Sequence, residues 1–390
     1  MIFLALAGII AEFNPLHNGH KYLIEVAKSQ GNSVACVISG NFVQRGDVAI
    51  VPKFKRAQMA LISGADIVCE LPIPWSMSTA QNFAFGAVSQ LSSLNIDSLY
   101  FGSECGDINE LKSTADILLS DEFNLKLNER ISDGLTFAKL RSDLLCDFIG
   151  KQTSVLTSPN DTLAVEYIIA AKKLGLDIDF VAVKRQGAMH NDTAETMEYS
   201  TATLLRNATH NNDTAHLKKY MPSDAYDILV SSPIANLDKI DVAIVSKLKQ
   251  LELSDIASLP DISEGLENLI YKSIRKHHTF DDICYEIKSK RYTLARIRRI
   301  LLSGYLGIDN STFLKEPPYL RILGFNDSGL EYLSNNSKKP IITRVSQIDE
   351  LDEYSKRIFK TENLSNEVYA LSLDRPENFV NEQSEPIIRY

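Results

Sequence analysis

The chain has 390 residues, of which 44% are hydrophobic and 23% charged, a profile typical of a globular protein whose length favours two domains over one. Its net charge of −9 argues against nucleic-acid binding by overall charge, and no stretch reaches the roughly 18 apolar residues that a membrane-spanning helix needs. The five cysteines form no C-x-x-C pair, which indicates free thiols in a reducing cytoplasm and disfavours a zinc site.

The first half of the chain alternates strand patterns with helix patterns. An apolar strand over residues 3–11 is read as a core strand and not a signal peptide, because a basic start and a cleavage site are missing. Further strands are expected over 33–39, 65–72 and 96–104, and helices over 18–29, 52–64 and 80–94. This alternation predicts an α/β fold with a parallel sheet, which binds ligands at the carboxyl ends of its strands.

The second half is predominantly helical. Residues 107–150 show no strand pattern and predict a helical insertion in the sheet domain. The sheet resumes over 176–185, and a helix begins near Thr203. Amphipathic helices dominate afterwards, so we expect a sheet domain over residues 1–207 and a mainly helical domain over residues 208–390.

The stretch NPLHNGH lies where the first strand meets the first helix. A helix start presents free N–H groups and a positive dipole end that favour phosphate, and Gly19 lets a nucleotide approach the backbone. His17 and His20 are three residues apart on one helical face, so both rings can stabilise an α-phosphate under attack. This spacing predicts adenylyl transfer; the alternative is two surface histidines at a helix cap.

A second segment, STATLLR, supports that interpretation. Thr203 is expected to cap the helix that follows the last strand, and Arg206 comes three residues later on that helix. The alternative is a capping residue with an unrelated surface arginine. Gln44, Arg45 and Lys53 follow the second strand and are read either as lining a substrate pocket or as a solvated loop and helix face.

Local charge departs from the acidic total between residues 272 and 299. This segment contains nine basic residues and only three acidic ones. Tyr271, Tyr285 and Tyr292 are candidates for stacking on bases. The density of this patch favours RNA contact over a merely solvated surface. The basic residues are Lys272, Arg275, Lys276, Lys288, Lys290, Arg291, Arg296, Arg298 and Arg299.

These motifs resemble known families. NPLHNGH resembles the HxGH signature of the nucleotidylyltransferase superfamily, which has a Rossmann-like sheet. Together with SGNFVQRGD, YFGSE, PNDTLAVEY, VKRQGAMHND, YSTATLLR and PPYLRILGF, it resembles the tRNA(Met) cytidine acetate ligase family over nearly the whole chain. That resemblance implies activation of acetate by ATP with Mg²⁺ to acetyl-adenylate, followed by acetylation of the wobble cytidine of elongator tRNA(Met), without acetyl-CoA.

The resemblance also implies site residues. His17, His20 and Arg206 would be catalytic, and Gly102, Asn160, Arg185 and Thr203 would complete the nucleotide site. The ATP-binding loop would comprise Ala7, Gly8, Ile9, Ile10, Ala11, Glu12, Phe13, Asn14, Pro15, Leu16, His17, Asn18, Gly19 and His20.

The chain departs from the family pattern in two places. An aromatic-His-Asp ending is replaced by Met189-His190-Asn191-Asp192, which leaves His190 and Asp192 without an assigned role, and Leu16 replaces a common phenylalanine. Two other functions stay open at this point: an adenylyltransferase for a small phosphorylated substrate, and a non-catalytic RNA-binding protein. The intact motif residues argue against the second.

Overall fold

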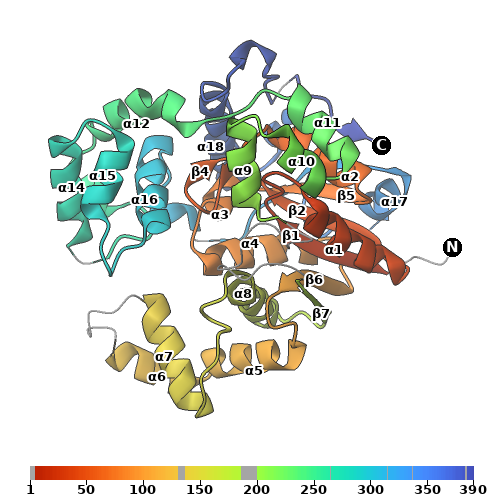
Figure 1. The fold of residues 1–390 in the computed structure, drawn as a ribbon, viewed down its shortest axis with the longest axis horizontal. Helices are drawn as coiled ribbons and strands as arrows, with labels where there is room; N and C mark the ends of the chain where they lie inside the picture. Colours follow the sequence, from red (N-terminus) through yellow and green to blue (C-terminus); the bar gives the residue numbers. More distant parts are fainter. Residues whose placement is uncertain are drawn as a thin grey trace.

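A twisted, mostly parallel sheet forms the centre of the computed structural model, which describes residues 5–130, 137–185, 200–263, 265–313, 315–335, 337–382 and 384–390 (Figure 1). Its strands are β1 (Leu6–Ala11), β2 (Ser33–Ser39), β5 (Ile67–Leu71), β6 (Ser98–Ser103), β7 (Asp179–Lys184), β8 (Leu320–Phe325), β9 (Ile341–Ile342) and β10 (Ile388–Arg389). They lie in the order β10-β8-β5-β2-β1-β6-β7, and β9 pairs with β8. The α/β class and the parallel sheet expected from the sequence are confirmed.

The order of the strands locates the ligand-binding edge. From β1 the chain first builds outward through β2 and β5, and it then crosses to the other side of β1 to add β6 and β7, all in parallel. The order of the strands therefore reverses between β1 and β6, and open α/β sheets bind their ligands at the carboxyl ends of the strands at such a switch point.

Helices cover both faces of the sheet. Ala7 and Ile9 of β1 pack beneath one layer, whereas Leu6 and Ile10 pack beneath the other, because successive side chains of a strand point to opposite faces. The first layer contains α1 (Asn18–Ser29), α2 (Lys53–Ile62), α9 (Ala202–His210), α10 (Thr214–Tyr220) and α11 (Ser223–Ser231). The second contains α4 (Ala80–Ser92) and α8 (Pro159–Lys173), with the short α3 (Ile73–Ser76) leading into α4.

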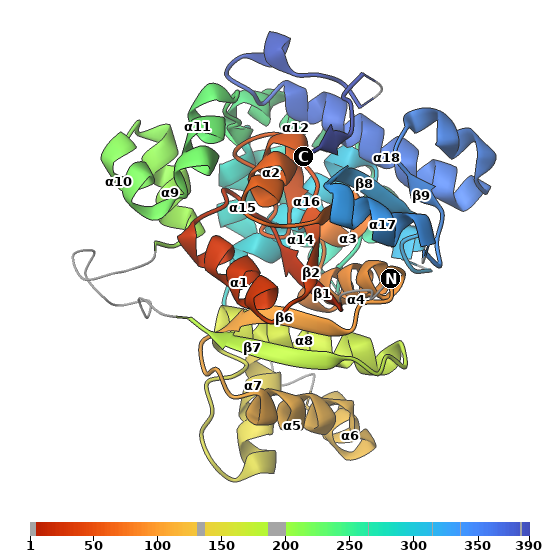
Figure 2. The same cartoon turned by 90° about the vertical axis from the view of Figure 1, so that its right-hand side faces the viewer.

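The expected insertion is helical. Between β6 and α8 the chain forms α5 (Ile108–Leu119), α6 (Asp121–Glu129) and α7 (Phe137–Ile149), which lie beyond α8 on the outer side of the sheet (Figure 2). Leu111 and Ala115 of α5 join the same hydrophobic core as α8, so the insertion is an extension of that layer.

Residues 237–306, called the helical body below, pack around a core of their own. This body contains η1 (Leu237–Ile240), α12 (Asp241–Leu248), α13 (Leu253–Ala257), α14 (Leu266–Lys276), α15 (Phe280–Ile287) and α16 (Leu294–Leu306). Its core also takes in Phe42 and Val48, from the small hairpin of β3 (Phe42–Val43) and β4 (Asp47–Val48). The helical body thus lies directly against the loop that follows β2 (Figure 1).

The C-terminal segment differs from the mainly helical expectation. After η2 (Asn310–Phe313), β8 enters the sheet antiparallel to β5, and all six of its residues are buried. The remaining elements are α17 (Asp327–Asn335), η3 (Val345–Glu350), α18 (Glu353–Ala370) and η4 (Pro376–Asn378), besides β9 and β10. A boundary at residue 207 therefore does not separate the sheet from the helices, because β8, β9 and β10 belong to the sheet.

A buried cluster of charges joins this segment to the sheet. Lys53 Nζ of α2 lies 2.5 Å from Glu70, 2.7 Å from Glu382 and 3.6 Å from Glu362, while Arg321 of β8 lies 2.7 Å from Glu382. Burial and the neighbouring Glu362 raise the pKa of Glu70 well above its usual range, which favours the protonated form of this carboxyl group. Lys53 is 1% exposed, so both readings of it, as a pocket residue and as part of a solvated helix face, were wrong.

Candidate active site

The two histidines close the junction between β1 and α1. His17 is the N-cap of α1, and His20 occupies the third helical position. The backbone N–H of His20 donates to Nδ1 of His17 at 3.3 Å, and the N–H of His17 donates to Nδ1 of His20 at the same distance. This reciprocal capping box stacks the two rings with centroids 3.7 Å apart. Because both Nδ1 atoms accept hydrogen bonds, each ring carries its proton on Nε2.

The environment keeps both rings neutral. Burial, helped by the positive charge of Arg185, lowers the pKa of His17 to about 3. Burial, His17 and Arg185 also lower the pKa of His20 well below its usual range. Two neutral imidazoles can donate Nε2–H hydrogen bonds to an anion, but they do not act as general acids at neutral pH.

Hydrogen bonds fix the turn that leads to the histidines. Phe13 has a φ of 47°, a backbone conformation that bulky residues rarely adopt, and its ring meets His20 edge-on at 5.0 Å. Asn14 Oδ1 accepts the N–H of Ile50 at 2.8 Å. Arg56, which is fully buried, donates to the carbonyl of Glu12 and also to those of residues 39, 40 and 51.

The predicted loop of residues 7–20 divides into two parts. Ala7, Gly8, Ile9 and Ile10 lie inside β1, and a Cβ on Gly8 would come within 2.8 Å of Leu91, so this glycine serves packing against α4. The part that reaches the carboxyl edge comprises Ala11, Glu12, Phe13, Asn14, Pro15, Leu16, His17, Asn18, Gly19 and His20.

Gly102 and Arg185 meet across the neighbouring strands. Gly102 lies near the end of β6, and a Cβ there would be 3.5 Å from Cγ of Arg185, which follows β7. The N–H of Arg185 continues the ladder by donating to Ser103. His190 and Asp192, which come soon after, lie outside the described residues.

Asn160 does not cap α8, contrary to one of its two expected roles. Its side chain donates to Glu104 Oε1 at 2.6 Å, and Glu104 accepts the N–H of Asp161 at 3.0 Å. Glu104, at the end of β6, thus satisfies the start of α8 and orients the Asn160 amide at the carboxyl edge. Sequence reasoning missed Glu104, for which the acidic residue directly after the strand in YFGSE was an available signal.

The capping role expected of Thr203 was wrong, because Thr201 is the N-cap of α9 and accepts the N–H of Leu204. Thr203 is the second residue of the helix, where its hydroxyl accepts from Arg206 Nη2 at 3.0 Å and from Arg45 Nη1 at 3.3 Å. Arg206 also donates to the carbonyl of Asn14 at 2.9 Å. These bonds bring α9 to the turn that precedes His17.

The basic patch of residues 272–299 is only partly a surface. Arg296, Arg298 and Arg299 are partly buried and bond within the protein, and Tyr292 is 8% exposed, so these residues do not form an open binding face. Tyr285 is 58% exposed. The exposed cations are Lys272, Arg275, Lys276, Lys288, Lys290 and Arg291.

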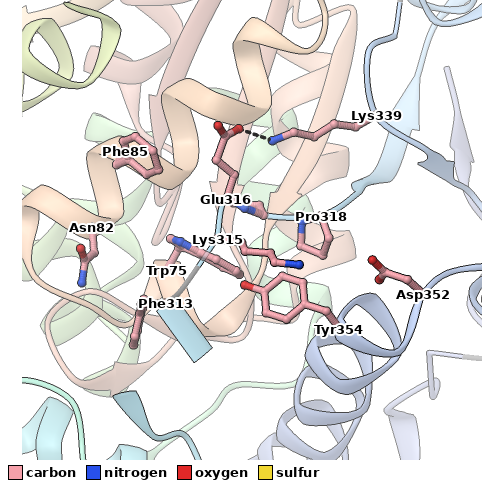
Figure 3. A pocket seen from close by; sticks show the side chains of 11 residues that line it. Trp75, Asn82, Phe85, Phe313, Lys315, Glu316, Pro318, Lys339, Asp352 and Tyr354 are labelled. Carbon is pink, nitrogen blue, oxygen red and sulfur yellow. Dashed lines mark hydrogen bonds and ion pairs between the residues drawn. The ribbon is translucent and has the colours of Figure 1, made fainter. Parts of the chain in front are cut away.

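A separate cavity of about 700 Å³ lies between α4, α18 and the segment before β8 (Figure 3). Phe85, Phe313 and Tyr354 line it, together with the pair formed by Lys339 and Glu316. It contains none of the predicted site residues. Within the described ranges, no helix is long and apolar enough to cross a membrane, and no three His, Cys, Asp or Glu side chains gather as metal ligands.

Comparisons with known proteins agree with this geometry. The HIGH Nucleotidyl Transferase family matches residues 4–384. A protein of Thermoanaerobacter sp. (strain X514) named tRNA(Met) cytidine acetate ligase is 40% identical over 388 residues, covering 95% of this chain and 96% of the relative. A protein of the same name from Clostridium kluyveri is 39% identical and covers 87% of this chain and 90% of the relative.

Two solved structures are similar over 99% of both chains. Apo Thermotoga maritima TmcAL superposes with a TM-score of 0.92 at 30% identity, and the same protein bound to alpha-thio ATP superposes with a TM-score of 0.89 at 29% identity. The chain therefore belongs to the HIGH nucleotidyl transferase family, among the tRNA(Met) cytidine acetate ligases.

Proposed function

We propose that this protein binds ATP, activates acetate as acetyl-adenylate and acetylates N4 of the wobble cytidine of elongator tRNA(Met). The observation that carries the proposal is the pair of neutral, mutually capped histidines at the switch point of the sheet, near Arg185, with Arg206 bound to the turn that precedes them. The names of the relatives and the alpha-thio ATP in the similar structure support the same reaction.

The first step joins acetate to the nucleotide. A carboxylate oxygen of acetate attacks the α-phosphorus of ATP in line, and the bond from that phosphorus to the β-phosphate oxygen breaks, which releases pyrophosphate. The reaction needs no protein nucleophile, so positioning and stabilisation of charge supply the catalysis. His17 and His20 donate their Nε2–H groups to the α-phosphate oxygens, and Arg206 holds the leaving pyrophosphate.

The remaining predicted residues position the nucleoside. The adenosine approaches the backbone at Gly102, where a glycine has no side chain to obstruct it. Arg185, whose Cγ would lie 3.5 Å from a Cβ at Gly102, adds positive charge near both histidines. Asn160 offers its amide edge from the start of α8. We expect Mg²⁺ to enter with ATP as part of the substrate, because the described residues provide no carboxylate cage for a resident ion.

The second step uses the activated acyl group. The cytidine amine attacks the carbonyl carbon of the mixed anhydride, AMP leaves, and the amine loses a proton. The wobble base has to leave its stack to reach the site. The exposed cations of the helical body, such as Lys290 and Arg291, are placed to bind the tRNA backbone. Acetyl-CoA is not required, and a tRNA substrate makes the reaction cytoplasmic.

The test uses carbon-14 acetate, ATP and Mg²⁺ with elongator tRNA(Met), and in parallel a tRNA without a wobble cytidine. We expect label in the first RNA only, and none with the His20→Ala variant. His210→Ala is the matched control, because this exposed histidine ends α9 and touches none of the site residues.

The two alternatives predict other outcomes. An adenylyltransferase for a small phosphorylated substrate would label neither RNA but would release pyrophosphate with that acceptor. A non-catalytic RNA-binding protein would bind tRNA without consuming ATP. Either result would overturn the proposed function.

A further inference from the structure

Two arginines converge on one hydroxyl near the turn that leads to the histidines. Arg45 Nη1 and Arg206 Nη2 both donate to Thr203 Oγ1, at 3.3 and 3.0 Å. Neither guanidinium forms an ion pair with a carboxylate in the described part of the chain. Burial and the neighbouring Arg45 lower the pKa of Arg206, so its positive charge is destabilised as the protein stands. Glu12 and Asp47 offset part of this effect without forming an ion pair with Arg206. Two adjacent guanidiniums that no carboxylate contacts in the described ranges are suited to an anion with several oxygens.

The peptide that carries Arg45 is held on both sides by α16. Arg299 Nη1 donates to the carbonyl of Gln44 at 3.3 Å, and Arg298 Nε donates to the carbonyl of Gly46 at 2.9 Å. Gly46 has a φ of 71°, and a Cβ there would come within 2.7 Å of Arg298 Cβ, so the loop passes directly against the helix. The N–H of Gln44 donates to Glu12 Oε1 at 3.0 Å, which ties the same loop to the turn before His17.

Ion pairs hold Arg298 and Arg299 in place within the helical body. Arg299 pairs with Asp261 at 3.2 Å, and Arg298 pairs with Asp281 of α15 at 3.1 Å and with Asp47 at 3.7 Å. A shift of the helical body would therefore move the backbone of residues 44–46, and with it the Arg45 side chain. Two exposed cations of the helical body, Lys290 and Arg291, lie just before α16 in the chain.

We propose that Arg45 binds the outer phosphates of ATP beside Arg206, and that Arg298 and Arg299 are positioning residues through which the helical body holds Arg45 in the nucleotide site. The proposal rests on the function proposed above, since it takes ATP as the anion. It makes the RNA-binding part of the molecule a structural component of the ATP site.

The test compares the binding of ATP and AMP by calorimetry. Arg45→Ala should weaken ATP binding about 10- to 100-fold, the loss of one or two charge-assisted hydrogen bonds, and leave AMP binding unchanged. Lys173→Ala is the control, because this exposed lysine ends α8 at the opposite edge of the sheet. Unchanged ATP binding by Arg45→Ala, or an equal loss for ATP and AMP, would refute the contact with the outer phosphates.

The positioning role is tested with Arg298→Met. Releasing Arg45 should weaken ATP binding about 2- to 10-fold, because binding must then order a free side chain, and the effect should vanish in the Arg45→Ala background. An equal loss in both backgrounds would show that Arg298 does not act through Arg45. Where thermal unfolding shows Arg298→Met to be unstable, Arg298→Lys replaces it, since it keeps the charge but not the Nε donor. A wild-type protein that binds no ATP would contradict the proposed function itself.

Discussion

Because the two histidines are neutral in the fold, we expect acidification to lower the free energy of unfolding of this protein more than that of a variant without the pair. The pKa of His17 is about 3 in the fold, against about 6.5 in an unfolded chain. As the pH falls below about 6.5, His17 becomes protonated in the unfolded chain but stays neutral in the folded protein. The free energy of unfolding that is present above that pH is therefore progressively lost. At pH 5.5 the loss is about 1.4 kcal/mol for His17, with at most about the same from the partly exposed His20.

The assay is urea unfolding at pH 7.5 and 5.5 for the wild type and for the double variant His17→Asn with His20→Asn. Asparagine at position 17 keeps an oxygen that can cap α1, so the helix start is retained. We expect the variant to lose between about 1.4 and 2.8 kcal/mol less unfolding free energy than the wild type on acidification. Equal losses in the two proteins would show that the rings titrate normally in the fold, and would refute the role of neutral Nε2–H donors.

Three further predictions follow from other parts of the structure. Lys53→Met should lower the free energy of unfolding by about 3–5 kcal/mol because it leaves buried carboxyl groups with too little positive charge, whereas Glu70→Gln should lower it by less because burial favours the protonated form of Glu70, which the amide resembles; comparable values from urea titrations would contradict this assignment of charges. Gly102→Val should reduce ATP affinity at least about tenfold, which calorimetry measures, because the added side chain would contact Arg185 at the site; the thermal midpoint should change little, since the exposed Arg185 side chain can move aside. The double variant Lys290→Glu with Arg291→Glu should raise the KM for tRNA and flatten its salt dependence without affecting ATP binding; an unchanged KM would remove these residues from the RNA interface.

Local patterns in the sequence determined much of the fold. The helix over residues 18–29 and the strand over residues 33–39 have the predicted bounds, because periodic apolar residues and a turn at Gly31 specify them without reference to the rest of the chain. The same is true of the junction that carries His17 and His20, since a strand, a turn and a helix start are all encoded within twenty residues. Motif and context together therefore indicated the family from the sequence.

The tertiary structure decided which charged residues are internal. Lys53 reads as the polar face of a helix, yet its partners come from residues 70, 362 and 382, far apart in sequence. Arg321 likewise makes β8 look partly exposed in the sequence, although the strand is fully buried. Its charge is compensated by Glu382, which is distant in sequence. The pattern of a single segment carries no information about a distant counter-charge, so such residues are assigned to the surface by default.

The same reason explains what the sequence left open at the site. Thr201 and Thr203 are only two residues apart, and the sequence does not show which of them caps α9. The contact of α9 with the loop after β2 shows that Thr201 caps the helix and that the Thr203 hydroxyl binds Arg45 and Arg206. Arg298 appeared as part of a nucleic-acid patch, whereas in the fold it holds Gly46. The sequence specifies which side chains a segment carries, whereas long-range packing determines their partners. Those partners determine whether a charged residue binds a ligand itself or positions another residue that binds the ligand.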